Sequence, residues 1–280
     1  IVLGFDPGHM RILSLLGFRK SRLLRPGTGF SPPAVEEEES VRYADRITYV
    51  GNLPAEGVRF LENGLLKPIR PDLLPVIDKG VDYLLANPRG RLYEWLEAYM
   101  PRDCGIHPRH LYVVIQDKAT WRRRRAFLEP LADCGLDLYG PNSWSEPDVA
   151  GRLVGCYSGR MVNYETELPR IYAFSAINLN LTHSQIGEST NQRIYDVLGC
   201  GGFLLTDDNP GIHDEFTDGE HLVVARTPEE MREKALYYLE RPEERHRIAE
   251  NGRRLVLERY TYPHRLSQLL RIAALDTIED

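Results

Sequence analysis

Short apolar runs alternate with longer amphipathic stretches along most of this 280-residue chain. Seven of these runs are rich in Val, Ile, Leu, Phe or Tyr and have the length of strands. They are Ile1–Phe5, Arg46–Gly51, Leu136–Tyr139, Arg160–Tyr164, Ala176–Leu181, Gly202–Thr206 and His221–Ala225. Their nearly continuous apolar character suits parallel strands that are buried on both faces. Strands that alternate with helices predict an α/β fold with a parallel sheet and right-handed crossovers.

Two helices are marked clearly near the end of the chain. The segment Thr227–Glu230 supplies a capping residue, a proline at the first helical position and acidic residues in the first turn. We expect that helix to end near Glu240 and a second one to span about Pro242–Tyr260. The run Leu111–Ile115 could be strand or helix, and its continuation at helical spacing favours a helix from Pro108 onward.

Composition and charge narrow the classes of function. The chain is 42% hydrophobic and 27% charged, as is usual for a soluble globular protein. Its formal net charge of -6 argues against a nucleic-acid partner, because phosphate contacts need a clustered basic surface. The one basic run, Arg122–Arg125, would wrap around a helix, so we interpret it as a solvated, salt-bridged segment.

The cysteines and the apolar runs suggest a cytoplasmic protein. The four cysteines are far apart and lack zinc-ligand spacing, so we expect reduced thiols: Cys104, Cys134, Cys156 and Cys200. No apolar run approaches the ~20 residues that span a bilayer, so we expect no integral membrane segment. The sequence begins directly on a strand-like run without Met, which suggests a fragment whose N-terminal part is missing.

The most informative stretch for function is Gly187–Asp208, which reads GESTNQRIYDVLGCGGFLLTDD. We expect a helix that starts near Asn191, is capped by Ser189 or Thr190, and ends at the glycines after Cys200. The first N–H groups of a helix have no acceptor within it, and the helix dipole adds positive potential. Such an end binds phosphate, and this one follows a predicted strand of the sheet.

Two acidic residues flank this predicted phosphate site. Glu188 precedes the helix and Asp196 lies within it, with seven residues between them. A carboxylate can accept both hydrogen bonds of a vicinal diol, as it does when acidic groups hold ribose hydroxyls. One helix start could therefore hold a diphosphate while Asp196 holds the ribose and Glu188 the sugar. Taken alone, the two acids could equally be a capping acid and a solvated helix residue.

These residues resemble a known family. Retaining GT-B glycosyltransferases carry two glutamates separated by seven residues, and Glu188 and Asp196 have that spacing with Asp in second place. The run NQRIYDVLGCGGFLLTDD resembles the C-terminal domain of CgeB-like (spore-maturation-protein-type) glycosyltransferases more closely. Looser similarity extends over about residues 45 to 270 and includes Tyr49–Asn52, Tyr157–Leu181 and Glu258–Arg265.

The resemblance implies roles for residues around the helix start. Asp196 would bind the ribose hydroxyls, and Glu188 would contact the donor sugar. Backbone N–H groups of Ser189, Thr190, Asn191 and Gln192 would face the distal phosphate. Arg193 matches an arginine of the family and would either pair with phosphate and take part in catalysis or form a structural ion pair.

Further donor-binding residues are implied outside this helix. Gly51 and Asn52 end a strand that faces the same cleft, and Arg59 could add positive charge near the diphosphate. The backbone of the segment that contains Gly159, Arg160 and Val162 would read the base. Trp144 is either a wall of the base pocket or a core residue.

The pair Asp207-Asp208 could bind a divalent metal, but Asp208-Asn209-Pro210-Gly211 reads equally as a turn that caps the next helix. We therefore predict no metal site and no cofactor. The resemblance also implies two parts. Residues 1–44 would be the remnant of an N-terminal GT-B domain plus the interdomain linker. Residues 45–280 would be a Rossmann-like nucleotide-sugar-binding domain with a helical insertion at about 55–134 and C-terminal helices.

The sequence therefore predicts a metal-independent, retaining glycosyltransferase. Its donor would be a nucleotide-diphosphate sugar, of which a UDP-sugar is favoured, and its acceptor a glycan, a protein or a small molecule. Two alternatives stay open: a non-catalytic nucleotide-sugar-binding module, and an epimerase of the UDP-GlcNAc 2-epimerase type with the same fold.

Overall fold

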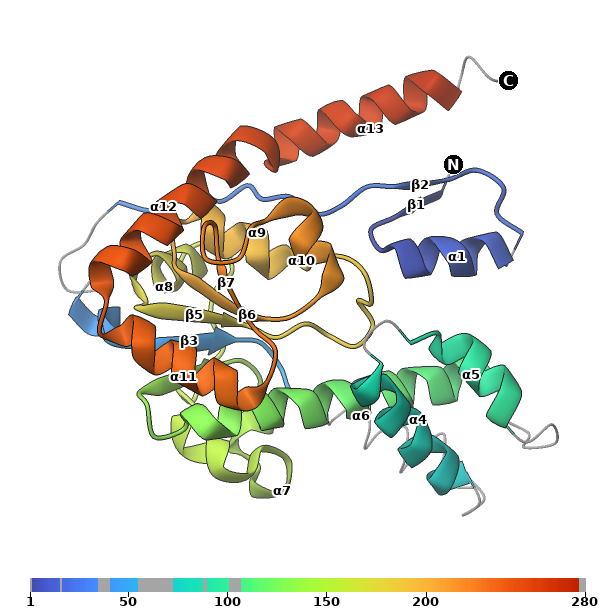
Figure 1. The fold of residues 1–280 in the computed structure, drawn as a ribbon, viewed down its shortest axis with the longest axis horizontal. Coiled ribbons are helices and arrows are strands. Elements are labelled where there is room, and N and C mark those ends of the chain that lie inside the picture. The colour runs from blue at the N-terminus through green and yellow to red at the C-terminus, as the bar shows by residue number, and fades with distance from the viewer. Residues whose placement is uncertain are drawn as a thin grey trace.

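Five parallel strands form the central sheet in the order β4-β3-β5-β6-β7. Their bounds are β3 Ile47–Val50, β4 Leu136–Tyr139, β5 Ile177–Asn180, β6 Leu204–Asp207 and β7 Val223–Ala225. The computed structural model describes residues 2–15, 17–34, 41–54, 73–87, 90–100 and 107–276. Within these residues the predicted parallel sheet is confirmed, and Figure 1 shows helices on both of its faces.

Both faces of the sheet are buried because apolar residues occupy consecutive positions in the strands. In β6, Leu204 and Leu205 belong to separate apolar cores, and Val223 and Val224 do the same in β7. Helices α6 and α11 cover one face, and α9, backed by α8 and α12, covers the other. These helices are α6 Pro108–Leu128, α8 Leu168–Phe174, α9 Gln192–Gly199, α11 Pro228–Leu239 and α12 Pro242–Arg259.

A helical unit with a core of its own lies beside the carboxyl ends of the strands. Helices α4 (Leu74–Ala86) and α5 (Leu92–Tyr99) pack against each other and against the first half of α6. The second half of α6 runs on to the sheet, so this single long helix joins the unit to the rest of the fold (Figure 1). The predicted helix from Pro108 onward is confirmed.

The first residues form a small separate sheet. Strands β1 (Val2–Gly4) and β2 (Ser21–Leu23) are parallel and are joined through α1 (Pro7–Leu15). The chain then reaches α9, where Thr28 lies against Gly199 and forms an isolated bridge with Thr261, just before α13 (Tyr262–Asp276). Two further short α-helices lie within the described residues, α7 (Pro147–Ala150) and α10 (Pro210–Glu215).

Most predicted elements are confirmed. Six of the seven predicted strands are present, and Thr227 caps α11 by accepting a hydrogen bond from the N–H of Glu230 at 3.1 Å. The strand predicted at Arg160–Tyr164 is wrong. There the Asn163 side chain accepts hydrogen bonds from two following N–H groups, so the backbone turns instead of pairing. None of the described helices has the length and apolar composition needed to cross a membrane.

Candidate functional site

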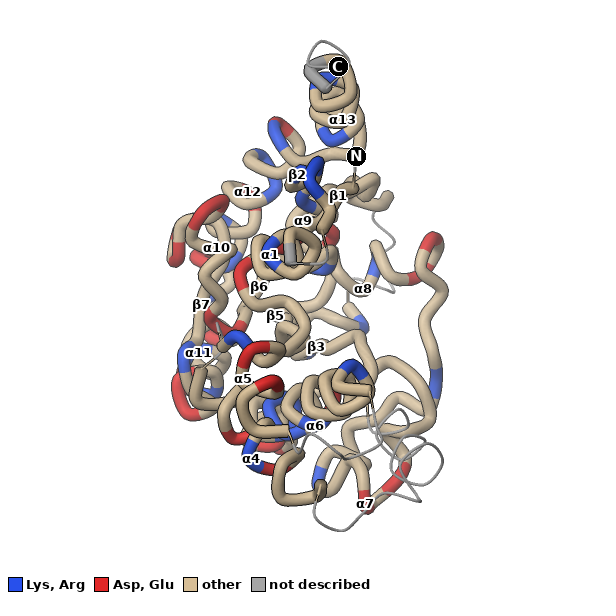
Figure 2. The backbone as a smooth tube through the Cα atoms, turned by 90° about the vertical axis from the view of Figure 1, so that its right-hand side faces the viewer, with Lys and Arg blue, Asp and Glu red and all other residues tan. Residues whose placement is uncertain are grey.

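The strand order reverses between β3 and β5. From β3 the chain adds β4 on one side and then β5 on the other, so the loops that follow β3 and β5 diverge. Ligands of open α/β sheets bind outside the carboxyl ends of the strands at such a switch point. Figure 2 views the molecule from this end, with α1 above the strand ends and α6 below them. Gly51 and Asn52 follow β3, and the segment that leads to α9 follows β5.

Helix α9 begins at this switch point, but its cap differs from the predicted one. The capping position is Asn191, and its side chain makes no capping hydrogen bond. Thr190 was a predicted cap, yet its hydroxyl contacts the Tyr195 hydroxyl and Glu215 instead. Asn191 donates from Nδ2 to Asn180 Oδ1 at 2.8 Å. The first turn of α9 therefore keeps backbone N–H groups without a side-chain acceptor.

Two arginines converge on the ring of Tyr49 beside the start of α9. The guanidinium carbon of Arg193 lies 5.1 Å from the ring centroid, and that of Arg124, on α6, lies 5.9 Å from it. A side chain at Gly51 would place its Cβ 2.9 Å from an Arg193 nitrogen, so the glycine makes room for this guanidinium. Arg193 Nη1 also donates to Asn180 Oδ1 at 2.8 Å.

Neither arginine forms an ion pair with a carboxylate of the described residues. Arg124 is 4% exposed, and its Nη1 donates to the carbonyl and side-chain oxygens of Asn52 at 2.7 and 2.8 Å. Burial lowers the pKa of Arg124, and the nearby charge of Arg193 lowers it further. Arginine stays protonated nonetheless. The switch point thus holds two positive charges whose hydrogen-bond acceptors are neutral oxygens, and the nearby Asp207 carboxylate is paired with Arg123 instead.

Unpartnered polar atoms gather in the same region. Four buried side-chain atoms here have no hydrogen-bond partner among the described residues: Tyr49 Oη, Arg124 Nε, Ser189 Oγ and Asn191 Oδ1. Buried polar groups are paired in most proteins, so each such atom requires an explanation. Donors and an amide oxygen left open beside two cations suit a polar, anionic ligand that carries hydroxyl groups.

Glu188 lies on the other side of the helix start, against α1. Its carboxylate forms an ion pair with Arg11, and its N–H donates to Asp6 Oδ2 at 2.9 Å. Asp6 also accepts from the N–H of Gly8 and so fixes the start of α1. The Glu188 side chain is 26% exposed and lines a cavity of about 80 Å³ that it shares with His9 and Arg11.

Asp196 is buried within the fold. Its Oδ1 accepts from Thr28 Oγ1 at 2.7 Å and from Gln192 Nε2 at 2.9 Å, and its Oδ2 accepts from the Tyr164 hydroxyl at 3.1 Å. Burial raises the pKa of this carboxyl above its ordinary value. Both oxygens are therefore engaged by protein donors where the ribose was expected. Glu188 precedes α9 and Asp196 lies within it, as predicted.

The segment predicted to read the base is followed by Tyr164, whose hydroxyl donates to Asp196. Gly159 has φ +76°, which favours glycine, and Arg160 pairs with Glu167 at 2.6 Å. The carbonyl of Arg160 accepts from the N–H of Gly140 just after β4, and Val162 packs partly buried against the core. This segment therefore borders the sheet on the Asp196 side.

Trp144 is a core residue, which corrects its assignment to a pocket wall. It is 0% exposed, and its Nε1 donates to the Gly51 carbonyl at 2.8 Å. A buried ring offers no face to a ligand, so its contribution is to hold the turn after β3. Arg59 was also predicted to contact the donor, and it lies outside the described residues.

The acids after β6 serve the fold. Asp207 is 0% exposed and accepts from Arg123 Nε and from the N–H and hydroxyl of Thr182, each at 2.9 Å. Asp208 pairs with His213 at 2.7 Å, and the next residue, Asn209, caps α10 by accepting from Gly211 N at 2.9 Å. The prediction of a turn that caps the next helix is confirmed.

A family described as glycosyl transferase-like matches residues 122–271, from the end of α6 to α13. This match covers more than half of the chain and includes Arg124, Glu188, Arg193 and Asp196. The chain belongs to the glycosyl transferase-like family. Among curated proteins, no relative matches its sequence.

Solved structures share the fold of this glycosyl transferase-like chain at low sequence identity. HepE from Anabaena, solved in complex with UDP-glucose, is 10% identical, with a TM-score of 0.57 over 99% of this chain and 63% of its own. A glycosyltransferase from Rickettsia africae is 10% identical, with a TM-score of 0.56 over 97% of this chain and 62% of its own. Sucrose-phosphate synthase from Thermosynechococcus elongatus is 13% identical, with a TM-score of 0.52 over 100% of this chain and 59% of its own. This chain thus spans about 60% of the length of these structures, and the likeness shows a GT-B fold.

Sequence reasoning missed several residues of this glycosyl transferase-like site. The run Arg122–Arg125 was interpreted as solvated and salt-bridged; Arg123 pairs with Asp207 and Arg125 with Glu129, but Arg124 is buried. Asn180 was not singled out, although it joins Asn191 to Arg193. The signal for Asn180 was present: alternate asparagines in an otherwise apolar central strand indicate a buried polar function.

Proposed function

We propose that this chain is the donor-binding half of a CgeB-like GT-B glycosyltransferase that moves a sugar from a UDP-sugar to an acceptor hydroxyl. One observation carries the proposal. Arg124 and Arg193 are held at the switch point of the sheet without a carboxylate partner among the described residues, beside the open first turn of α9. Buried charges are usually paired, so this arrangement fits a site that an anion completes.

The donor would lie across the carboxyl ends of β3 and β5. Its diphosphate would contact the first N–H groups of α9 and the two guanidinium groups. Its ribose would contact Asp196, whose present partner Tyr164 belongs to the segment proposed to border the base. The likeness of the fold to HepE, whose structure contains UDP-glucose, supports the choice of a UDP-sugar.

The chemistry proposed for this site is stabilisation of a leaving group. The bond between the anomeric carbon and the diphosphate breaks, a bond to the acceptor oxygen forms, and the acceptor proton passes to the departing phosphate. Arg124, Arg193 and the amides of α9 would stabilise the charge that develops on that phosphate, without a metal ion. The spacing of Glu188 and Asp196 supports retention of configuration, with Glu188 beside the sugar.

Calorimetry with UDP and with uridine tests the anion site directly. Wild-type chain should bind UDP more tightly than uridine, and Arg193→Gln should weaken UDP binding about ten- to a hundredfold, since hydrogen bonds to charged groups contribute ~1.5–3 kcal/mol. Uridine binding should not change. A matched control is Arg125→Gln, which removes a neighbouring arginine that pairs with Glu129 at 2.6 Å.

The donor class and the turnover need a second measurement. A thermal-shift panel of UDP-, GDP-, ADP- and dTDP-sugars should give its largest shift with a UDP-sugar, and release of UDP should accompany transfer. Failure of the folded chain to bind any nucleoside diphosphate would contradict the proposal. Tight binding with no turnover in the complete protein would indicate a non-catalytic module.

A further inference from the structure

Three residues that could cap α9 precede it, and none of their side chains does so. Ser, Thr and Asn are preferred at helix starts because their side-chain oxygens accept hydrogen bonds from the first N–H groups. The chain carries one of each at Ser189, Thr190 and Asn191. Asn191 has the backbone angles of a capping residue, φ -93° and ψ 164°, but makes no capping bond, and the buried Ser189 hydroxyl has no partner within the described residues. The open helix start therefore needs an explanation in the residues around it.

Asn180, at the end of β5, holds the Asn191 side chain where it does not cap the helix. Asn180 Oδ1 accepts from Asn191 Nδ2 and from Arg193 Nη1, each at 2.8 Å. Arginine can only donate, so the Asn180 atom at this position is the oxygen. Asn191 must therefore present its nitrogen to Asn180, which leaves its own Oδ1 buried and unpartnered in the described part of the chain.

The orientation of Asn180 is itself fixed by the neighbouring strand. Asn180 is 0% exposed, and its Nδ2 donates to Thr206 Oγ1, on β6, at 2.9 Å. The Thr206 hydroxyl donates in turn to the Asp207 carbonyl at 3.1 Å. A reversed Asn180 amide would place its nitrogen against Arg193 and its oxygen against a Thr206 oxygen that has no proton left to donate. These hydrogen bonds thus fix which atom Asn191 can offer to Asn180.

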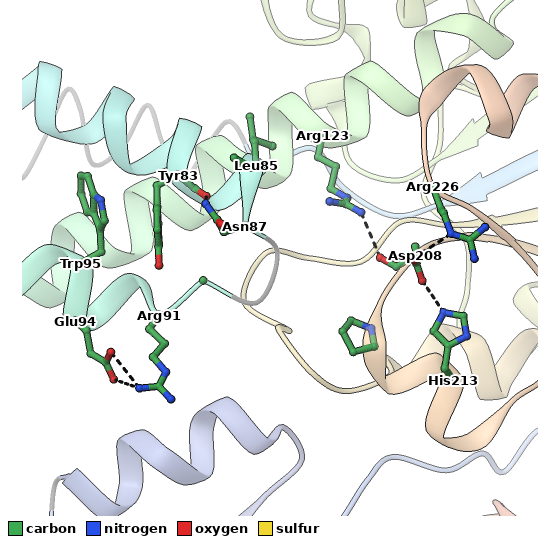
Figure 3. Close-up of a pocket in the computed structure, with 13 residues that line it drawn as sticks. Tyr83, Leu85, Asn87, Arg91, Glu94, Trp95, Arg123, Asp208, His213 and Arg226 are labelled. Carbon is green, nitrogen blue, oxygen red and sulfur yellow. Dashed lines mark hydrogen bonds and ion pairs between the residues drawn. The ribbon is translucent and has the colours of Figure 1, made fainter.

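Thr190 is engaged in a comparable way by α10. Its hydroxyl donates to the Glu215 carboxylate at 3.0 Å. Helix α10 is anchored near its start, because His213 pairs with Asp208 at 2.7 Å across the loop after β6 (Figure 3). The Thr190 hydroxyl is therefore used for a contact between α10 and the segment before α9, and it makes no capping bond.

We propose that Asn180 is a positioning residue that keeps the start of α9 uncapped, so that the N–H groups of its first turn stay open to the diphosphate of the donor. This inference rests on the proposed function for the identity of the anion, whereas the open helix start is a property of the chain alone. A capping oxygen and a phosphate oxygen compete for the same N–H groups. The stabilisation that a cap would give to the helix is thus given up in favour of ligand binding.

A double-mutant cycle with UDP tests this competition. Asn180→Ala frees the Asn191 side chain to cap α9 and should weaken UDP binding at least about fivefold in calorimetry, the size of one capping hydrogen bond. Adding Asn191→Ala removes the competing oxygen and should make UDP binding about fivefold tighter than in Asn180→Ala. A merely structural Asn180 would give no such gain, because the second substitution could then only add to the loss.

Amide hydrogen exchange in the absence of nucleotide tests the same claim independently. The N–H of Arg193 lies at the second position of α9, which a capping side chain protects. NMR should find that this N–H exchanges at least about fivefold more slowly in Asn180→Ala than in wild type, and that fast exchange returns in Asn180→Ala/Asn191→Ala. Equal exchange rates in the three proteins would overturn the inference.

Two controls separate positioning from a loss of stability. Asn178→Ala removes the other buried asparagine of β5, which donates to the carbonyls of Tyr172 and Phe203, and should lower Tm without changing UDP affinity. Uridine lacks the diphosphate, so its affinity should be equal in wild type and all variants. Asn180→Ser serves in the same cycle if Asn180→Ala does not fold, because a serine hydroxyl is too short to reach Asn191.

The outcomes also distinguish this inference from the proposed function. If wild type and Asn180→Ala bind UDP equally, or if adding Asn191→Ala gives no gain, the positioning role is overturned and the donor site stands. If no protein binds UDP but exchange of the Arg193 N–H is slowed in Asn180→Ala, Asn180 does keep the helix start uncapped and the nucleoside diphosphate is overturned as its ligand.

Discussion

Replacing Arg124 by Met should weaken nucleotide binding without destabilising the fold. Arg124 is 4% exposed, its Nε has no hydrogen-bond partner among the described residues, and burial lowers the pKa of its guanidinium. These observations all show that the folded chain gains little from the charge itself. Methionine fills much of the same space with an unbranched, adaptable side chain.

The effect on stability follows from two opposing contributions. Arg124→Met removes two hydrogen bonds from a charged donor to Asn52, each contributing up to ~1.5–3 kcal/mol, but Asn52 is exposed and water can replace the lost donor. Replacement of buried ionic groups by apolar side chains of similar volume is often neutral or stabilising by ~1–4 kcal/mol. We therefore expect Tm to stay the same or rise by up to about 6 °C.

The effect on binding has the opposite sign. Loss of a charged donor to the diphosphate should weaken UDP binding about ten- to a hundredfold, from ~1.5–3 kcal/mol per hydrogen bond to a charged group. Calorimetry measures UDP and uridine affinities, and differential scanning calorimetry measures Tm. Arg125→Met is the matched control, because Arg125 is one residue away and pairs with Glu129.

Two results would refute this reasoning. If folded Arg124→Met bound UDP within twofold of wild type, the guanidinium would not belong to an anion site. If Tm fell by more than about 5 °C, the hydrogen bonds to Asn52 would be worth more than the cost of the buried charge, and Arg124 would be structural.

Four further predictions concern the neighbouring side chains. Burial raises the pKa of Asp196, so the folded state binds more protons than the unfolded state above pH 4 and the stability of the wild type falls as pH rises. The Tm of Asp196→Asn minus the Tm of the wild type should therefore grow from pH 4 to pH 7 in calorimetric scans, and a constant difference would contradict this. Tyr164→Phe releases Asp196 Oδ2 and should strengthen UDP binding about fivefold, because one hydrogen bond contributes ~1 kcal/mol. Binding of 2′,3′-dideoxy-UDP should not improve. Equal UDP affinities of wild type and Tyr164→Phe would exclude competition between Tyr164 and the ribose. Glu188→Gln should lower Tm only slightly, because the ion pair of Glu188 with Arg11 is partly exposed. The same change should slow sugar transfer at least about tenfold and leave UDP affinity unchanged, and full transfer activity would show that Glu188 is not part of the site. Trp144→Phe leaves the Gly51 carbonyl without its donor and should lower the free energy of unfolding in urea by ~1–3 kcal/mol, with uridine affinity within twofold of wild type. A large loss of uridine affinity would instead support a role of Trp144 as a wall of the base pocket.

Local sequence signals were sufficient for the elements that contain them. The helix at α11 was predictable because Thr227 and Pro228 mark its start, and both do so in the structure. The start of α6 at Pro108 was predictable for the same reason. The parallel direction of the strands followed from apolar runs separated by helices, since parallel strands need crossovers.

Contacts between distant segments could not be predicted in this way. The run Arg122–Arg125 is uniformly basic, yet only Arg124 is fully buried, because the position of α6 against the sheet decides which side chain is covered. The partner of Asp196 from the first part of the chain, Thr28, is 168 residues away. Periodicity and spacing carry no information about such pairs.

The junction at Thr28 ties three separate parts of the molecule together. Its backbone bridges Thr261, its hydroxyl donates to Asp196, and the preceding Pro26 carbonyl accepts from Arg265 on α13 at 2.7 Å. A hinge motion between the small first sheet and the large one would act on this single segment. Withdrawal of the Thr28 hydroxyl would leave Asp196 Oδ1 with Gln192 as its remaining side-chain donor, so a movement of the small sheet would free part of the hydrogen-bonding capacity of this acid.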